Sequence, residues 1–360
     1  MLAQGAHAPR TVTSRIQFIH PVLPNLLPDH LANLPPSPYN PAPLSVLEIL
    51  SVKHRSPKTA HRPGAHLLCL WVCALGMTLG CHALRLEQPS PDKLPPPAAK
   101  LPPPPGKYSF RVSQYQFLSD FEVKHDLPIF RELANLRDQV YKELQLQSAD
   151  STVQVYIFED RDKYENFMRG RYPDLPKRRA FFVAQPRSVG GAEDLLVYTY
   201  WGDRIQEDLR HELTHALLHS VLRDVPLWLD EGLAEYFEVP PDWKGVNYQH
   251  LNQIRRVSSG GGFKPDLARL EQMVQVQQMT PAEYREAWAW VHLMLRGRAD
   301  AKAVLTEYLQ TLRSNPNPGP IGPRLTAVYP NPETTLIDHV AQLEATNLNP
   351  PEEPALPRIQ

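Results

Sequence analysis

The sequence is 360 residues long, with 39 prolines, 38 basic and 39 acidic side chains, and a formal charge of −1. This length allows one large domain or two modest ones, but the proline content indicates that the folded part is smaller than the chain. The balanced charge gives no overall basic field, so nucleic acid is not expected as a partner. Cysteines occur only at Cys69, Cys73 and Cys81, so the rest of the chain has neither a disulfide nor a thiolate metal site.

Residues 1–65 contain eleven prolines, scattered polar residues and no sustained hydrophobic period. This composition predicts a disordered segment. The alternative is that translation starts further along, at a non-Met codon such as that of Val52, which would leave most of this extension untranslated.

The apolar stretch Leu67–Gly80 follows a segment that carries Lys53, Arg55, Lys58 and Arg62. As a helix it would reach about 21 Å, short of the roughly 30 Å hydrocarbon core of a membrane. A basic segment before a short apolar one is typical of an export signal. Residues 66–86 are therefore predicted to be a signal peptide or a membrane anchor, which would place the protein in the cell envelope.

The letters MTLGC, which end at Cys81, resemble the box of bacterial lipoproteins, in which a small residue precedes a lipidated cysteine. Gly80 fits that pattern, whereas Thr78 stands where Leu is usual. Lipidation of Cys81 is one expectation. Cleavage nearby, after a small residue such as Ala83, and an uncleaved anchor are the alternatives.

Residues 87–107 hold nine prolines in 21 positions. Such a segment favours polyproline II at about 3.1 Å per residue, which makes it a stiff spacer of roughly 60 Å. The chain would thus be exported and tethered to the membrane through its N-terminal part, with the folded domain held away from the surface. The tail, 347–360, is predicted to be disordered.

Residues 108–245 have the composition of a folded α+β domain with a small mixed sheet. Four segments rich in β-branched and aromatic residues predict strands: 108–121, 152–159, 179–184 and 194–201. Apolar residues at helical spacing predict a helix over 128–146. From 246 to 346 the signals are mostly helical, with Thr280 and Glu283 forming a capping box before a helix that stops at Gly297 and further helices over 301–312 and 332–343.

The letters HELTH place His211 and His215 four residues apart, so one helix face can present both imidazoles to one ion. Glu212 lies about 100° round the helix and can reach a water on that ion without ligating it. Asp203 is expected to cap this helix, which should end near Leu222.

A third ligand has to come from elsewhere, because a catalytic zinc site with two histidines commonly adds a carboxylate. His219 lies about 12 Å from His211 along the helix axis, too far to share the ion, and is expected on the helix surface. Glu231, on a second helix over Leu227–Phe237 that packs back across the first, is the predicted ligand. Glu235, one turn further, is predicted to accept the N–H of a ligating imidazole.

HELTH followed by WLDEGLAEYFE resembles the gluzincin metallopeptidases, most closely their peptidase-MA-like bacterial members. The resemblance implies zinc, ligated by His211, His215 and Glu231, with Glu212 as general base, Glu235 supporting a ligand, and a peptide or protein as substrate. The strand 195–201 resembles the edge strand along which such enzymes lay a peptide. The alternative is an inactive zinc-binding interaction protein of the envelope.

The family also uses a Tyr or His side chain to stabilise the oxyanion, and Tyr284 and His292 are candidates for that role. The alternative is that both are ordinary packing or surface residues. Two features of the family are missing. The spacing from His215 to Glu231 is shorter than in its well-known members, and no motif for gripping a free N-terminus is visible.

Overall fold

The computed structural model describes residues 17–19, 103–186, 193–222, 224–258 and 260–346, which belong to one compact unit. The expectations for the export signal, for Cys81, for the proline-rich linker up to residue 102 and for the C-terminal tail lie outside this range. Among the described residues, no helix has the length and apolar character needed to cross a membrane.

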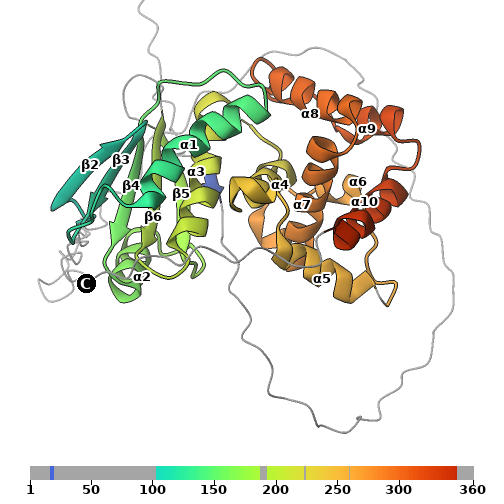
Figure 1. Ribbon diagram of the computed structural model, residues 1–360. Coiled ribbons are helices and arrows are strands. Elements are labelled where there is room, and N and C mark those ends of the chain that lie inside the picture. Colours follow the sequence, from blue (N-terminus) through green and yellow to red (C-terminus); the bar gives the residue numbers. More distant parts are fainter. Residues whose placement is uncertain (1–16, 20–102, 187–192, 223, 259, 347–360) are drawn as a thin grey trace, which may run out of the picture. The chain divides into compact units, whose positions relative to one another are not determined.

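A six-stranded mixed sheet forms one side of the unit (Figure 1). Its order is β1-β5-β6-β4-β3-β2, and β4 runs parallel to both β3 and β6 while the other neighbours are antiparallel. The predicted small mixed sheet is thereby confirmed. The strands are β1 (Gln17–Ile19), β2 (Tyr108–Val112), β3 (Tyr115–Ser119), β4 (Val153–Phe158), β5 (Ala180–Pro186) and β6 (Glu193–Tyr200).

Two expectations about strands need correction. Gln17–Ile19, inside the segment expected to be disordered, pairs antiparallel with β5 as a short strand, since an outer strand offers unpaired N–H and C=O groups for such pairing. The strand expected at an edge of the sheet, 195–201, is mostly β6, which lies between β5 and β4. On that side of the sheet β5 is second from the edge, and the three-residue β1 is the edge strand.

Alternating side chains of the sheet enter two separate apolar clusters. Val155, Phe182 and Val197 join the larger core, on the face covered by α1 (Pro128–Glu143) and α3 (Ile205–Val221). Phe181 and Tyr198, their neighbours in sequence, join a smaller aromatic cluster under α2 (Arg161–Arg171). The period of two in these strands thus buries both faces of the sheet.

Helix α3 and the following α4 (Leu227–Phe237) form the expected antiparallel pair, and α4 has the predicted bounds. Helix α3 ends where predicted, with Leu222 as its C-terminal cap. Its N-terminal cap is Arg204 and no side chain caps it, so the expected role of Asp203 is not observed. Because α3 lies between the sheet and α4, almost all of its side chains are buried.

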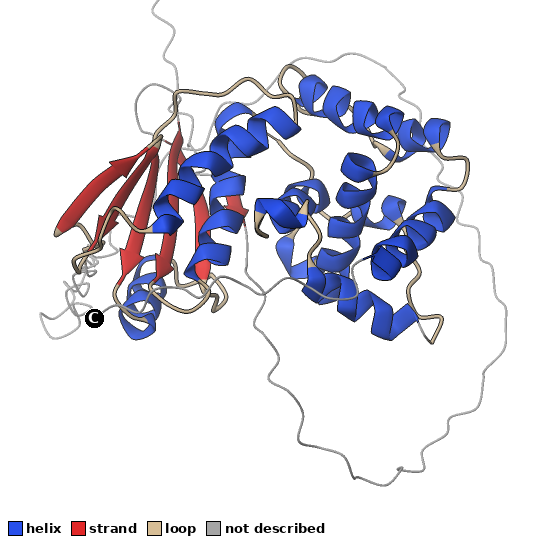
Figure 2. Ribbon diagram, in the orientation of Figure 1, coloured by secondary structure: helices blue, strands red, loops and turns tan. Residues whose placement is uncertain are grey.

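The C-terminal part is helical, as predicted (Figure 2). Its buried side chains belong to the same larger apolar core as those of the sheet. The capping box of Thr280 and Glu283 begins α7, which ends before Gly297 and packs against α4. The helices are α5 (Tyr248–Ser258), α6 (Leu267–Glu271), α7 (Pro281–Arg296), α8 (Ala299–Leu312), α9 (Gly322–Val328) and α10 (Pro332–Thr346).

Candidate metal centre

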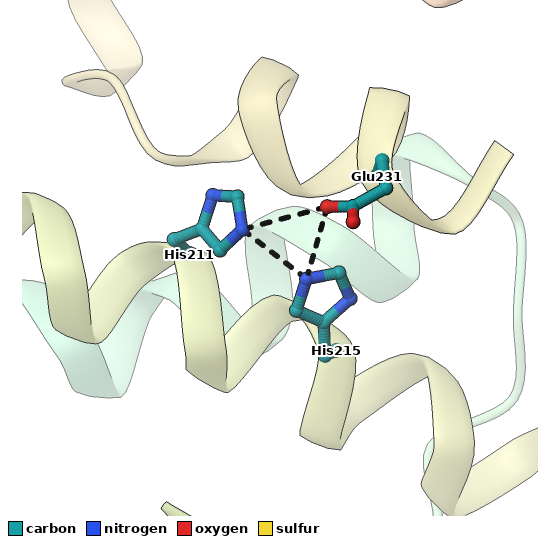
Figure 3. A group of neighbouring side chains, drawn as sticks. All are labelled: His211, His215 and Glu231. Atoms are coloured by element: carbon teal, nitrogen blue, oxygen red, sulfur yellow. Dashed lines mark hydrogen bonds and ion pairs between the residues drawn. The ribbon is translucent and has the colours of Figure 1, made fainter. Parts of the chain in front are cut away.

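Helices α3 and α4 bring three potential ligand atoms to one point (Figure 3). The Nε2 atoms of His211 and His215 lie 3.2 Å apart on one face of α3. The Oε2 atom of Glu231, from α4, lies 3.8 Å from each of them. All three side chains are fully buried, so the helix pair encloses a compact set of two nitrogens and one oxygen.

The size of this triangle suits a small divalent ion. A point equidistant from the three atoms lies about 2.1 Å from each, which is the length of ordinary zinc–nitrogen and zinc–oxygen bonds. In a tetrahedral complex of that bond length the ligand atoms are about 3.4 Å apart, so the glutamate oxygen would need to move about 0.4 Å closer to the two nitrogens. The cluster is compatible with a bound metal ion that keeps one position open.

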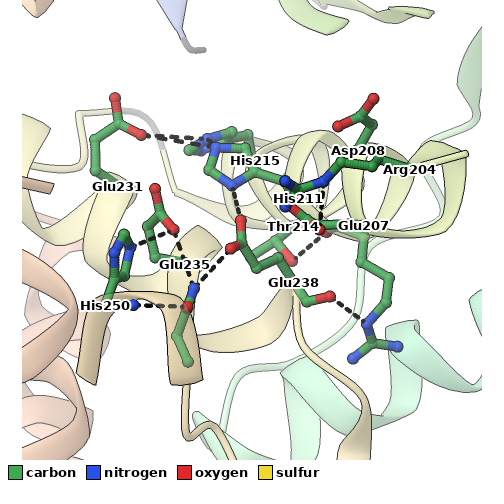
Figure 4. Close-up of polar contacts among 12 residues, drawn as sticks. Arg204, Glu207, Asp208, His211, Thr214, His215, Glu231, Glu235, Glu238 and His250 are labelled. Carbon is green, nitrogen blue, oxygen red and sulfur yellow. Dashed lines mark hydrogen bonds and ion pairs between the residues drawn. The ribbon is translucent and has the colours of Figure 1, made fainter. Parts of the chain in front are cut away.

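Each of the two histidines is oriented by a carboxylate on its other ring nitrogen. His211 donates from Nδ1 to Oε2 of Glu238 over 2.8 Å (Figure 4). His215 donates from Nδ1 to Oδ1 of Asp230 over 3.0 Å. These bonds fix the tautomer that each imidazole takes when it is neutral, in which the Nε2 lone pair is directed at the centre. Sequence reasoning missed Glu238 and Asp230, although a carboxylate in the buried helix α4 has to find a partner.

Glu235 does not contact a ligating imidazole, contrary to expectation. Its Oε2 accepts from Nε2 of His250 over 2.7 Å and from Nδ2 of Asn247 over 3.4 Å. The reason is the way α4 crosses α3, which places Glu238 rather than Glu235 against His211. Glu235 and Glu238 also lie within reach of a common ion with Nδ1 of His211, but hydrogen bonds within the protein already satisfy this group.

The pKa values of the two histidines are shifted in opposite directions. Burial would lower the pKa of His211, but the hydrogen bond and charge of Glu238 raise it to about 10. Burial lowers the pKa of His215 to about 4, against the pull of Asp230. A His211 that is protonated on Nε2 can donate to a neutral His215 across the 3.2 Å contact, and a metal ion that binds both Nε2 atoms has to displace that proton.

Glu212 follows His211 on α3, is fully buried and lies close enough to His211 for the charge of that imidazole to act on it. Among the described residues its two carboxylate oxygens have no hydrogen bond of regular geometry. Burial raises the pKa of this carboxyl to about 8, while the positive charges of His211 and Arg178 lower it. A cation bound beside it would lower the pKa further and restore the carboxylate, the form that accepts protons.

Tyr284, on α7, also faces the centre. Its buried hydroxyl lies close to Glu231. Burial raises the pKa of Tyr284 and the nearby charge of Glu231 raises it further, while the contact with Tyr284 lowers the pKa of Glu231. Gly232 makes this approach possible, because a Cβ atom there would lie 2.6 Å from the carbonyl oxygen of Ala287. The other oxyanion candidate, His292, is bonded through Nδ1 to His339 over 2.9 Å and packs on Trp288, neither of which belongs to the centre.

His219 is buried rather than on the helix surface, which corrects the expectation. Its Nε2 lies 2.9 Å from Oδ2 of Asp230, and its ring packs on Phe182 of β5. Burial favours the neutral acid at Asp230, but the two imidazoles hold the pKa of that carboxyl below its usual value. His219 was expected on the surface because the sequence pattern of one helix does not show that the sheet and α4 cover α3 on both sides.

A family model described as a protein of unknown function, DUF1570, matches residues 206–317. The comparison with curated proteins gave no match. A crystal structure of a mutant M1 zinc metallopeptidase from Deinococcus radiodurans is similar at 15% sequence identity and a TM-score of 0.33. That likeness covers 69% of this chain and 54% of the other, about half its length. A likeness this weak bears on neither activity nor substrate, so function has to be inferred from the residues of the site.

Proposed function

We propose that this chain is a zinc-dependent metallopeptidase that hydrolyses peptide bonds with a metal-activated water. The observation that carries the proposal is the convergence of two imidazole nitrogens and one carboxylate oxygen beside the buried Glu212, whose oxygens make no regular hydrogen bond among the described residues. A structural zinc site is normally closed by four ligands and needs no neighbouring base, whereas a catalytic site has three protein ligands and an open position. The HELTH and WLDEGLAEYFE segments resemble those of gluzincins, which supports the same assignment.

A bound zinc ion would polarise the scissile carbonyl and make a water acidic enough to attack at neutral pH. His211, His215 and Glu231 would hold it. Glu212 would take the proton of that water and deliver it to the leaving amine. The hydroxyl of Tyr284 would donate a hydrogen bond to the negative charge that develops on the carbonyl oxygen.

The proposed substrate is a peptide or protein. Strand β5 bears Phe182, whose ring lies 6.4 Å from that of His215, centroid to centroid. The side of this strand that faces away from β6 is the position that an added extended chain would take, and the short edge strand β1 pairs there in the structure. β5, rather than β6, is therefore the proposed strand for substrate, which would take the place of β1.

The cellular place of this activity is proposed from the sequence alone: export to the cell envelope and tethering through the N-terminal segment, with Cys81 as the lipidated residue. The change Cys81→Ser tests it. If Cys81 carries the anchor, the variant should leave the membrane fraction and lose the mass of the lipid. An unchanged fraction and mass would favour an uncleaved anchor.

The decisive variant for hydrolysis is Glu212→Gln, which keeps the shape of the side chain but removes the base. We expect the variant to retain zinc and to lose cleavage of a broad peptide library. The matched control is Glu207→Gln on the same helix, whose carboxylate pairs with Arg204 and should be dispensable for hydrolysis. Full cleavage by Glu212→Gln would exclude this residue as the base. A wild-type chain that binds zinc but cleaves nothing would instead indicate the alternative, an inactive zinc-binding protein.

A further inference from the structure

A line of three buried side chains leads away from the candidate centre along α3. His215 and His219 are one turn apart on that helix, and Asp230 of α4 lies between their rings. Oδ1 of Asp230 is 3.0 Å from Nδ1 of His215, and Oδ2 is 2.9 Å from Nε2 of His219. The exposed fractions are 0% for His215, 1% for Asp230 and 9% for His219, so the line runs from the interior toward the surface.

The donors and acceptors in this line can be assigned from chemistry. Nε2 of His215 faces the other ligand atoms and has to be free of a proton to bind an ion, so Nδ1 carries the proton and donates to Asp230. An ionised carboxylate can only accept, so His219 donates from Nε2 to the second oxygen. Asp230 is thus held at both oxygens, and it cannot turn about its side-chain bond without losing one of the two.

The other ligand is supported in a parallel way but by a different group. Glu238 accepts from His211 with one oxygen and from the amide of Asn247 with the other, over 2.7 Å. At Asp230 an imidazole takes the place of that amide. His219 is in turn held against Phe182, with ring centroids 5.5 Å apart, so its position is set by the sheet as well as by its helix.

We propose that His219 is a positioning residue for the metal centre: by donating to Asp230 it fixes the carboxylate that aims Nε2 of His215 at the ion. This inference rests on the proposed function only for the binding of an ion at His211, His215 and Glu231. It does not depend on hydrolysis.

Two substitutions of one residue test the inference in the 360-residue chain. His219→Gln retains an N–H donor at a comparable reach, whereas His219→Leu keeps a similar volume without a donor. His292→Leu is the control, because it removes a buried imidazole from α7 that is bonded to His339 rather than to the centre. The measurements are the zinc dissociation constant, from competition with a chelator at fixed pH, and the absorption spectrum with Co²⁺ in place of zinc.

His219→Leu should weaken zinc binding about 10-fold and alter the cobalt spectrum, as expected when an outer partner of a ligand is lost. His219→Gln should restore the spectrum and bring the affinity back to within about threefold. The control should lower the unfolding temperature and leave both metal measurements unchanged.

The inference is overturned if His219→Leu is merely less stable, like the control, with wild-type affinity and spectrum. It is also overturned if His219→Gln loses as much affinity as His219→Leu, because donation would then not matter. A wild-type chain that binds neither zinc nor cobalt refutes this inference together with the proposed function. If the variants show the expected metal effects but no peptide is cleaved by the wild type, the inference stands and the proposed function fails.

Discussion

Removal of Glu231 or of Glu235 should have opposite effects on metal binding and on stability. Glu231→Ala reduces the converging ligand atoms from three to two, so zinc affinity should fall by more than the roughly 10–100-fold that loss of an outer partner costs. In Glu235→Ala the three ligand atoms remain, and because its carboxylate bonds His250 and Asn247 rather than a ligating imidazole, affinity should fall by less than about 10-fold.

Stability in the presence of a chelator should change in the other direction. Burial raises the pKa of Glu231 well above its usual value, so its charged form is unfavourable there, and Glu231→Ala should not lower the free energy of unfolding by much. Glu235→Ala leaves the imidazole of His250 without its acceptor in the interior, while Asn247 still donates to Glu238, and the loss should cost roughly 1–3 kcal/mol.

Zinc competition with a chromophoric chelator and urea unfolding of the chelated protein measure the two quantities. If Glu235→Ala proved metal-free while Glu231→Ala kept wild-type affinity, the ligand assignment would be wrong. In that case α4 would be shifted by one turn, and Glu235 rather than Glu231 would ligate the ion.

Three further results are expected. Gly232→Ala should destabilise the protein by about 1–3 kcal/mol in urea unfolding, because its Cβ would overlap the carbonyl of Ala287, and unchanged stability would refute that close packing. Zinc affinity should rise by at least about tenfold per pH unit from pH 6 to 8, because the ion displaces a proton from His211, whose pKa is about 10, and a further one from Glu231 wherever burial keeps that carboxyl neutral; a flat profile would contradict this. Tyr284→Phe should keep zinc and KM but lower kcat by about 10²–10³-fold, and an unchanged kcat would remove this hydroxyl from the mechanism.

The helix pair and its three converging side chains were predictable because the signals are local. Residues four apart share a helix face, and a short turn after Leu222 returns the chain across it, which brings Glu231 to His211 and His215. The capping box at Thr280 likewise predicted where α7 begins. These features depend on residues near one another in sequence.

The errors concern contacts between distant segments. The order of β5 and β6 depends on which strands pair, and the period of two in a strand does not encode its neighbours. The burial of His219 and the assignment of Glu238 and Asp230 to the imidazoles depend on how α4 crosses α3. Helix α2 was missed because its sequence is mostly polar, although Asp160 caps it in the usual way.

The most direct test of the central claim is metal analysis of the purified wild-type chain combined with peptide-library digestion before chelation, after chelation and after zinc is restored. We predict about one zinc per chain, cleavage that stops when the metal is removed, and recovery of cleavage when zinc is returned. A chain that retains no zinc, or one whose cleavage continues at full rate without it, would contradict the proposal that His211, His215 and Glu231 hold a catalytic ion.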